Sequence, residues 1–215
     1  MSDIEPIVVY IHGRGPNPKK VTIILEELGI PYTTFTIQDP KAESFTKINP
    51  NGRLPAIEDP NTGLTLWESG AILEYLVEKY DKDHKLTFTT EPEKWYLKQY
   101  LHFQMSGQGP YYGQAFWFYH FHSEQVESAK ERYKEQVARV ISVLDKLLEG
   151  KEYLVGNKFT YADLAFIPWN ALAPLTDDLM EKFDIEKKYP NYIAWQNRLM
   201  TRPAVVKIMS PPAEK

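Results

Sequence analysis

Cysteine is absent from the sequence, and this absence limits the chemistry that the chain can perform. Without a thiol the chain can form neither a disulfide nor a thiolate metal site, and it has no cysteine nucleophile or redox-active cysteine. Redox chemistry therefore needs a thiol supplied from outside the chain. The sequence also lacks a signal-peptide pattern near Met1 and any run of about 18 apolar residues, so we expect a cytoplasmic protein with no membrane contact.

An excess of positive charge is missing too. The sequence has 25 lysines and arginines against 29 aspartates and glutamates, which gives a net charge of −4. Nucleic acids and anionic membranes attract a basic surface, so we expect neither as a partner. Histidine also fails to indicate a metal site. His120 and His122 are two residues apart and face different sides of a helix, and no carboxylate lies at a usual ligand spacing, so we expect no bound metal.

What is present is enough apolar sequence for two domains, with 43% hydrophobic residues in 215. A β-branched run at Ile7–Ile11 predicts a buried strand, and a helical pattern after Asn17 stops at Gly29, where the strand Tyr32–Ile37 follows. The next expected elements are a helix, two strands and a helix, at residues 41–48, 54–58, 64–67 and 69–80. This order is the thioredoxin-like pattern, so we expect an α/β domain over residues 1–84.

The second half of the chain contains no strand candidate. A charged, threonine-rich stretch at residues 82–92 predicts a linker, and residues 92–215 predict an all-helical bundle. Its expected helices span residues 93–121, 123–149, 161–172 and 191–200, with a short helix after Pro203.

The first candidate site is the loop at residues 14–19, between a strand and a helix. A helix N-terminus favours a negative charge such as a thiolate, and the Asn17 side chain can donate to it. Asn17 can equally be a simple helix N-cap.

The second candidate is NPNGRLPAI, residues 49–57. A cis peptide before Pro55 leaves the backbone of Leu54 free to pair in antiparallel fashion with a peptide ligand. The alternative is an ordinary proline at a strand edge.

The third candidate is Glu68 with Ser69, which open a helix. The serine hydroxyl and the first-turn amides can bind a carboxylate while Glu68 binds an ammonium group, which together fit the end of an α-amino acid. The alternative is capping of the helix. A further pair, Thr160 and Asp163, forms a capping-box pattern, and we assign it to folding.

A dense aromatic segment at residues 111–122 ends the first long helix of the second domain. Such residues are usually buried in a core. These occupy too many sides of the helix for one core, so we expect some to line a pocket or an interface.

These segments together resemble the glutathione transferase superfamily. The elements NPNGRLPAI, WESGAILEYL and KFTYADLAFIPWN look like its most recognisable segments, in the same order and spacing. Within the superfamily, PNPKKVTIILEELG, QMSGQGPYYGQAFWFYHFH and SAKERYKEQV resemble the fungal class related to the yeast nitrogen-regulation prion protein. The bacterial nu class of glutathione-dependent disulfide-bond reductases is similar over the same segments.

The resemblance implies roles for individual residues. Asn17 stands where alpha, mu and pi transferases use tyrosine, so it is the expected catalytic residue, in contact with the glutathione sulfur. Leu54 is expected to pair with the cysteinyl backbone beside a cis Pro55. Glu68 and Ser69 are expected to hold the γ-glutamyl end of glutathione.

Arg132 matches an arginine that reaches glutathione in nu-class relatives. Two positions depart from the pattern: Gly15 replaces a nu-class threonine, and Pro40 replaces a glutathione-contacting histidine of the yeast relative. The glycyl carboxylate of glutathione therefore needs another cation, Lys41 or Arg53. The electrophile pocket is expected near Gly109, Tyr111, Phe116 and Tyr119.

The implied function is a homodimeric glutathione transferase that conjugates glutathione, as co-substrate, to small hydrophobic electrophiles in detoxification. Glutathione peroxidase activity is compatible with the same site. Two alternatives stay open: a glutathione-dependent disulfide-bond reductase, and a non-catalytic glutathione-binding or regulatory protein. Two bound glutathiones can exchange a disulfide without a protein thiol, so the absence of cysteine excludes only a glutaredoxin-like mechanism.

Overall fold

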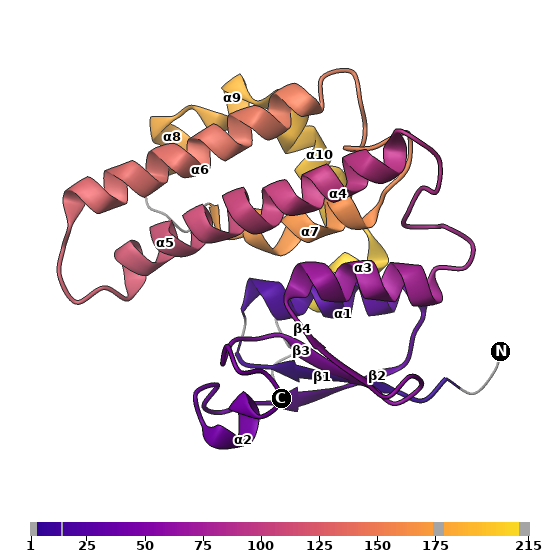
Figure 1. Cartoon of the computed structure of the whole chain (residues 1–215). Coiled ribbons are helices and arrows are strands. Elements are labelled where there is room, and N and C mark those ends of the chain that lie inside the picture. The colour runs from indigo at the N-terminus through magenta and orange to yellow at the C-terminus, as the bar shows by residue number, and fades with distance from the viewer. Residues whose placement is uncertain (1–3, 14, 174–178, 211–215) are drawn as a thin grey trace. The chain divides into compact units, whose positions relative to one another are not determined.

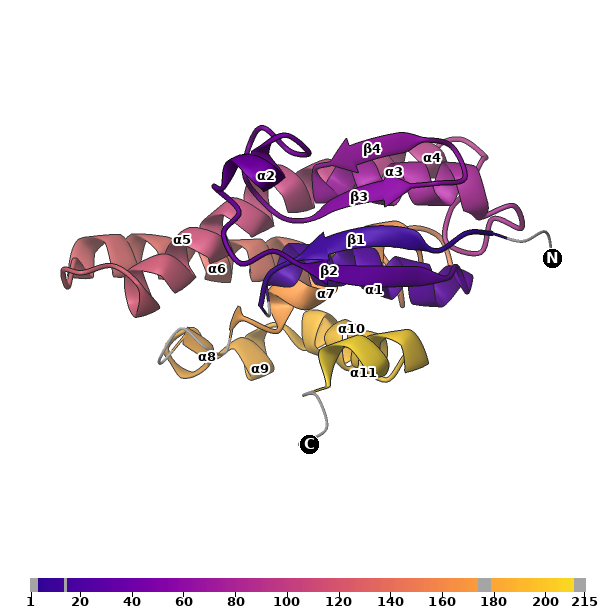
Figure 2. The same ribbon diagram turned by 90° about the horizontal axis from the view of Figure 1, so that it is seen from below.

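The computed structural model describes residues 4–13, 15–173 and 179–210. The chain forms two compact units, residues 1–87 together with 202–215, and residues 88–201. The first unit contains a four-stranded mixed sheet in the order β2-β1-β3-β4 (Figure 2). Its strands are β1 (Ile7–Ile11), β2 (Tyr32–Thr36), β3 (Ala56–Asp59) and β4 (Leu64–Trp67). β1 runs parallel to β2 and antiparallel to β3, and β3 runs antiparallel to β4, which confirms the predicted thioredoxin-like topology.

Two long helices of the first unit, α1 (Pro16–Leu28) and α3 (Ser69–Tyr80), lie side by side on one face of the sheet (Figure 1). Their apolar stripes are buried, as the helical periodicity predicts. Gly29 ends α1 in the left-handed conformation, with φ 66°, and its N–H donates to the carbonyls of the last turn. The short helix α2 (Glu43–Thr46) occupies only part of the predicted segment 41–48.

The last helix, α11 (Pro203–Met209), groups with the first unit, whereas the predicted boundary placed all of residues 92–215 in the helical domain. Two ion pairs to α1 accompany this packing. Arg202 binds Glu27 through two hydrogen bonds of 2.7 and 2.8 Å, and the Lys207 ammonium lies 2.7 Å from Glu26. A local helix signal does not specify which surface a helix packs against, so the sequence could not place this one.

The second unit is helical. Its longer helices are α4 (Glu93–Phe103), α5 (Gly109–His120), α6 (Glu127–Leu147), α7 (Tyr161–Asn170) and α10 (Pro190–Met200). Two one-turn helices, α8 (Leu179–Lys182) and α9 (Ile185–Lys188), are too short for the periodicity to predict. Figure 1 shows α5 and α6 side by side.

The helix predicted over residues 93–121 is interrupted by a π-helical turn, η1 (Gln104–Gln108). The N–H of Gly109 donates to the carbonyl of Gln104, five residues earlier, and Pro110 has no N–H to continue the α-helical ladder. Buried amides fix this turn to other helices. Gln104 donates to Gln108 at 3.0 Å, and Gln108 donates to Asn170 of α7 at 2.6 Å.

Asp163 anchors the start of α7, as its predicted role in folding requires. One carboxylate oxygen accepts from the Leu154 N–H and the Trp195 indole N–H, both at 2.9 Å. The other accepts from the Thr160 N–H at 3.0 Å and the Thr160 hydroxyl at 2.8 Å, within the predicted capping box. The side chain is fully buried, so this one residue ties a loop, a helix start and α10 together.

None of the helices in the described part of the chain is long and apolar enough to cross a membrane. Within residues 4–13, 15–173 and 179–210, no cluster of three acidic or histidine side chains could hold a metal ion.

Candidate functional site

Asn17 lies inside the first turn of α1, and Gly15 occupies the cap position. The alternative that Asn17 is the N-cap is therefore wrong. Pro16 and Pro18 flank it and have no N–H, so Asn17 supplies the only backbone donor among the first three residues of the helix. An anion at this helix end would find few backbone amides, which leaves the half-buried Asn17 side chain as an important local donor.

The turn before β3 presents the backbone of Leu54. Asn49 fixes this turn: its amide donates to the Arg53 carbonyl at 2.6 Å, and its side-chain oxygen accepts from the Asn51 N–H at 3.0 Å. The Leu54–Pro55 peptide is cis, as predicted. β3 begins only at Ala56, and in the described residues the N–H and C=O of Leu54 make no backbone hydrogen bond. They can pair with another chain.

Glycine is required at position 52 of this turn. Gly52 has φ +57°, and a Cβ added there would lie 2.7 Å from the Pro40 carbonyl oxygen. Residue 40 therefore packs directly beneath the turn that carries Leu54.

Of the two candidate cations for the glycyl carboxylate, Lys41 is the one tied to the turn. Its ammonium donates to the Asn51 carbonyl at 3.0 Å, while its side chain stays exposed. Arg53 is also exposed. Asn49 donates to its backbone carbonyl, and this hydrogen bond does not fix the position of its guanidinium. Arg53 precedes Leu54 directly in sequence, whereas the hydrogen bond to Asn51 brings Lys41 to the same turn and gives it the more defined position.

Glu68 and Ser69 form the start of α3 in an unusual geometry. Glu68 occupies the cap position with φ 72°, a left-handed conformation that costs a non-glycine residue about 1–3 kcal/mol. No side chain caps the helix there, so capping does not account for either residue. The Glu68 carboxylate is exposed and Ser69 is buried, which places a carboxylate and a hydroxyl beside the amides of the first turn.

Lys20 is a residue that the sequence analysis missed. It lies on α1, is 1% exposed, and its ammonium donates to the Ser69 hydroxyl at 3.3 Å. Burial lowers the pKa of Lys20 to about 7, against the opposing effect of the Glu68 charge. The available signal was its spacing, because Lys20 stands four residues before Ile24 and so belongs to the buried stripe of the helix.

The four residues expected at the electrophile pocket do not share one side of α5. Gly109 and Phe116 lie seven residues apart on one stripe, with Gly113 between them facing Trp169. Tyr111 is about 200° around the helix from Gly109, and its ring lies 5.6 Å from the Arg139 guanidinium of α6. Phe116 packs instead on His120, with ring centroids 4.4 Å apart. The pocket itself stays a prediction.

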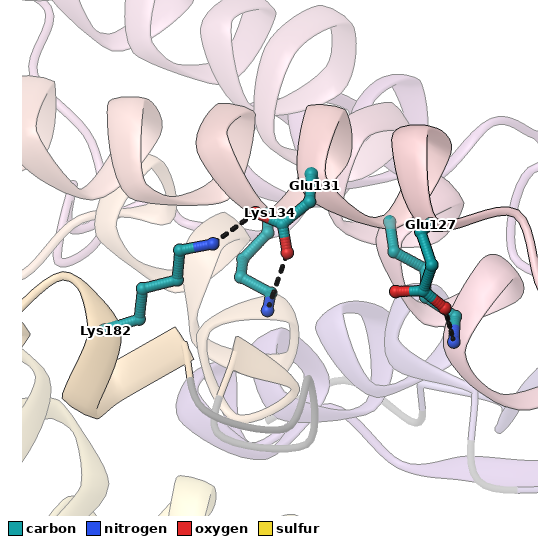
Figure 3. Close-up of polar contacts among 5 residues, drawn as sticks. Glu127, Glu131, Lys134 and Lys182 are labelled. Atoms are coloured by element: carbon teal, nitrogen blue, oxygen red, sulfur yellow. Dashed lines mark hydrogen bonds and ion pairs between the residues drawn. The ribbon is translucent and has the colours of Figure 1, made fainter.

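Tyr119 also turns toward α6, where two lysines cover its ring. The ammonium groups of Lys130 and Lys134 each lie 5.4 Å from the ring centroid. The carboxylate of Glu131 pairs with Lys134 at 3.4 Å and with Lys182 of α8 (Figure 3). Tyr119 therefore belongs to a packed, charged layer between helices.

Arg132 lies on a different side of α6. It is two residues from both Lys130 and Lys134, so it points about 160–200° away from the side that meets Tyr119, and it is exposed. Within the second unit, the structure does not bring Arg132 together with Tyr119.

The sequence of the chain matches two family descriptions that cover most of its length. Residues 5–78 match "Glutathione S-transferase, N-terminal domain", and residues 110–203 match "Glutathione S-transferase, C-terminal domain". The chain belongs to the glutathione S-transferase family. The predicted resemblance is thus confirmed, and the first match includes every candidate residue of the first unit.

Fungal proteins are among the relatives of this chain. The chain is 47% identical to the "Glutathione S-transferase-like protein tpcF" of Aspergillus fumigatus, over 98% of this chain and 97% of the relative. The glutathione transferase URE2P6 of Phanerochaete chrysosporium, solved in complex with oxidized glutathione, superposes with a TM-score of 0.89 at 44% identity, covering 97% of each chain. Ure2p5 of the same fungus, cocrystallized with 1-(S-glutathionyl)-2,4-dinitrobenzene, superposes with a TM-score of 0.87 at 41% identity, covering 97% of this chain and 94% of that one.

Proposed function

We propose that this protein is an enzyme that conjugates glutathione to small hydrophobic electrophiles. The observation that supports the proposal best is the set of binding groups on the first unit. They are Asn17 in the first turn of α1, the backbone of Leu54, which makes no backbone hydrogen bond to the described residues, and Glu68 with Ser69 at the start of α3. These groups suit a sulfur, a peptide backbone and an α-amino acid end, which glutathione combines in one molecule.

The proposed chemistry starts from the glutathione thiol. A thiol with a pKa of about 8.5 is only about 3% thiolate at pH 7, and the thiolate is the nucleophile. The Asn17 amide donates a hydrogen bond to the sulfur and so favours the thiolate. The sulfur then forms a bond to the electrophilic carbon, the leaving group departs with its electron pair, and the thiol proton passes to water.

Disulfide reduction is the second candidate, and the complex of the related URE2P6 with oxidized glutathione favours it. Here the thiolate of one glutathione attacks a disulfide, releases one thiol and forms a mixed disulfide. A second glutathione resolves the mixed disulfide, which yields oxidized glutathione and the second thiol. The chain itself needs no cysteine for this exchange.

Calorimetry with glutathione and two activity assays test the proposal. We expect binding of glutathione and turnover of 1-chloro-2,4-dinitrobenzene. Turnover of hydroxyethyl disulfide without turnover of the aryl halide would favour the reductase. An assay with an organic hydroperoxide tests the peroxidase activity in the same way. Binding without any turnover would leave a non-catalytic binding protein, and absence of binding would contradict the proposal altogether.

We further propose that the protein works as a homodimer in the cytoplasm, as the family resemblance implies. Sedimentation at micromolar concentration is expected to give twice the mass of the chain, and fluorescence microscopy of a tagged chain is expected to show a diffuse cytoplasmic signal. A monomer, or a signal confined to an organelle, would contradict these two points.

The turn at Gly52 offers a first mutational test. We expect Gly52→Ala to raise the KM for glutathione several-fold, because the new Cβ would lie 2.7 Å from the Pro40 carbonyl and the backbone of Leu54 must move. The substitution should also destabilise the first unit by about 1 kcal/mol or more, since alanine disfavours positive φ.

Gly63→Ala is the matched control. Gly63 also has positive φ, +69°, but a Cβ there meets nothing within 4 Å. It should therefore show the loss of stability without the change in KM. Equal KM values for the two variants would contradict the assigned role of the turn.

A further inference from the structure

A lysine is buried directly behind the expected γ-glutamyl site. Lys20 is 1% exposed, and its sequence neighbours on α1, Val21, Ile23 and Ile24, are fully buried apolar residues. Burying an ammonium group is costly unless hydrogen bonds and opposite charges compensate. The burial of Lys20 therefore calls for compensating contacts, and one of them is the Ser69 hydroxyl, 3.3 Å from the ammonium.

The chemistry of this contact fixes the direction of the Ser69 hydroxyl. An ammonium group only donates, whereas a serine hydroxyl has one proton to donate and two lone pairs to accept. Because the Ser69 oxygen accepts from Lys20, its own proton points away from the ammonium. Ser69 is the first residue of α3, where the amides of the first turn already favour an anion.

We propose that Lys20 is a positioning residue for the α-carboxylate of the γ-glutamyl end of glutathione. Its ammonium holds the Ser69 hydroxyl as a donor toward that carboxylate and places a positive charge one hydrogen bond behind it. The inference rests on the proposed binding of glutathione and assigns a residue that acts through Ser69.

The charges around Lys20 agree with this role. Glu68, from the junction of β4 and α3, is the neighbouring charge that acts on Lys20, and its exposed carboxylate is left to meet the ligand's ammonium group. A ligand carboxylate brought to the start of α3 meets the like charge of Glu68, which the ammonium of Lys20 offsets. Burial lowers the pKa of Lys20 to about 7, so a bound carboxylate would raise it again and keep the ammonium charged.

The test compares two ligands that differ in one group. Calorimetry measures the Kd of glutathione and of γ-aminobutyryl-cysteinyl-glycine, which lacks only the α-carboxylate. We expect Lys20→Met to raise the Kd of glutathione about tenfold, because one charge-assisted interaction is lost. The Kd of the analogue should change less than twofold. The control is Lys79→Met in the exposed last turn of α3, which should change neither Kd.

If Lys20→Met raises the Kd of both ligands equally, or of neither, Lys20 does not position the α-carboxylate. If the wild-type chain itself binds no glutathione, the proposed function is wrong, and this result is distinct from a failure of the role of Lys20.

A second measurement uses the wild-type chain, in case the Lys20 variant does not fold. Carbon NMR of labelled lysine side chains follows the titration of Lys20. Its midpoint is expected to rise when glutathione binds and to stay unchanged with the analogue. A midpoint that responds equally to both ligands, or to neither, would also overturn the inference.

Discussion

Replacement of Asp163 by alanine is expected to lower the free energy of unfolding by at least about 3 kcal/mol. The carboxylate accepts hydrogen bonds from the Leu154 N–H, the Trp195 indole and the Thr160 N–H, and all three residues are buried. Removing the acceptor leaves three buried donors without a partner, and each costs about 1–3 kcal/mol. The change also removes the capping box that starts α7.

Urea unfolding followed by circular dichroism measures this loss. Asp163→Asn keeps one acceptor oxygen and should lose less stability than Asp163→Ala. Glu149→Ala is the control, because Glu149 is exposed and a surface substitution usually changes stability by no more than about 0.5 kcal/mol. A loss below 1 kcal/mol for Asp163→Ala would show that the network around Asp163 contributes little.

Replacement of Asn17 by alanine is expected to lower kcat/KM for the conjugation reaction about 25-fold at pH 7. The reason is the thiolate fraction: a bound thiol with a pKa of about 6.5 is about 75% thiolate at pH 7, and a thiol with a pKa of about 8.5 is about 3% thiolate. A difference of about 2 pKa units corresponds to roughly 2.7 kcal/mol, within reach of one hydrogen bond to a charged group.

Ultraviolet absorbance of the bound thiolate, recorded against pH, measures this shift directly. We expect the pKa of the bound thiol to rise by about 2 units in Asn17→Ala, and to rise at least as far in Asn17→Asp, which has the same shape but places a negative charge beside the sulfur. Because the lost hydrogen bond favours the bound thiolate, the Kd of glutathione should rise only about fourfold at pH 7 in Asn17→Ala. If the bound-thiol pKa and kcat stay at wild-type values, Asn17 does not activate the sulfur.

Local sequence predicted the first unit closely. The strand Leu64–Trp67 and the helix Ser69–Tyr80 have the predicted bounds. A turn marks the start of the strand, and a change of periodicity marks the start of the helix. The helical unit was predicted less well. Its first long helix is interrupted by the π-helical turn Gln104–Gln108, whose buried amides hydrogen-bond to each other and to Asn170 of α7. Periodicity alone contains no sign of such a break.

The candidate site divides in the same way. Ser69 begins α3 at the boundary that the sequence indicated. Asn17 lies inside the first turn of α1 instead of before it, and Leu54 lies two residues before β3 begins. The sequence did not show that Tyr119 is covered by Lys130 and Lys134, or that Tyr111 turns toward Arg139. Those contacts depend on how α5 and α6 pack.

By itself the sequence determined the order of the strands and helices over residues 7–80 and the capping box of α7, while the cis Leu54–Pro55 turn was one of two local alternatives that the family resemblance resolved. Each of these depends on residues within a few positions of one another. Only the tertiary structure decided that α11 joins the first unit and that the ammonium of Lys20 meets the hydroxyl of Ser69, 49 residues away. Hydrogen bonds and ion pairs between distant segments form only once packing has brought those segments together, and no local pattern encodes that.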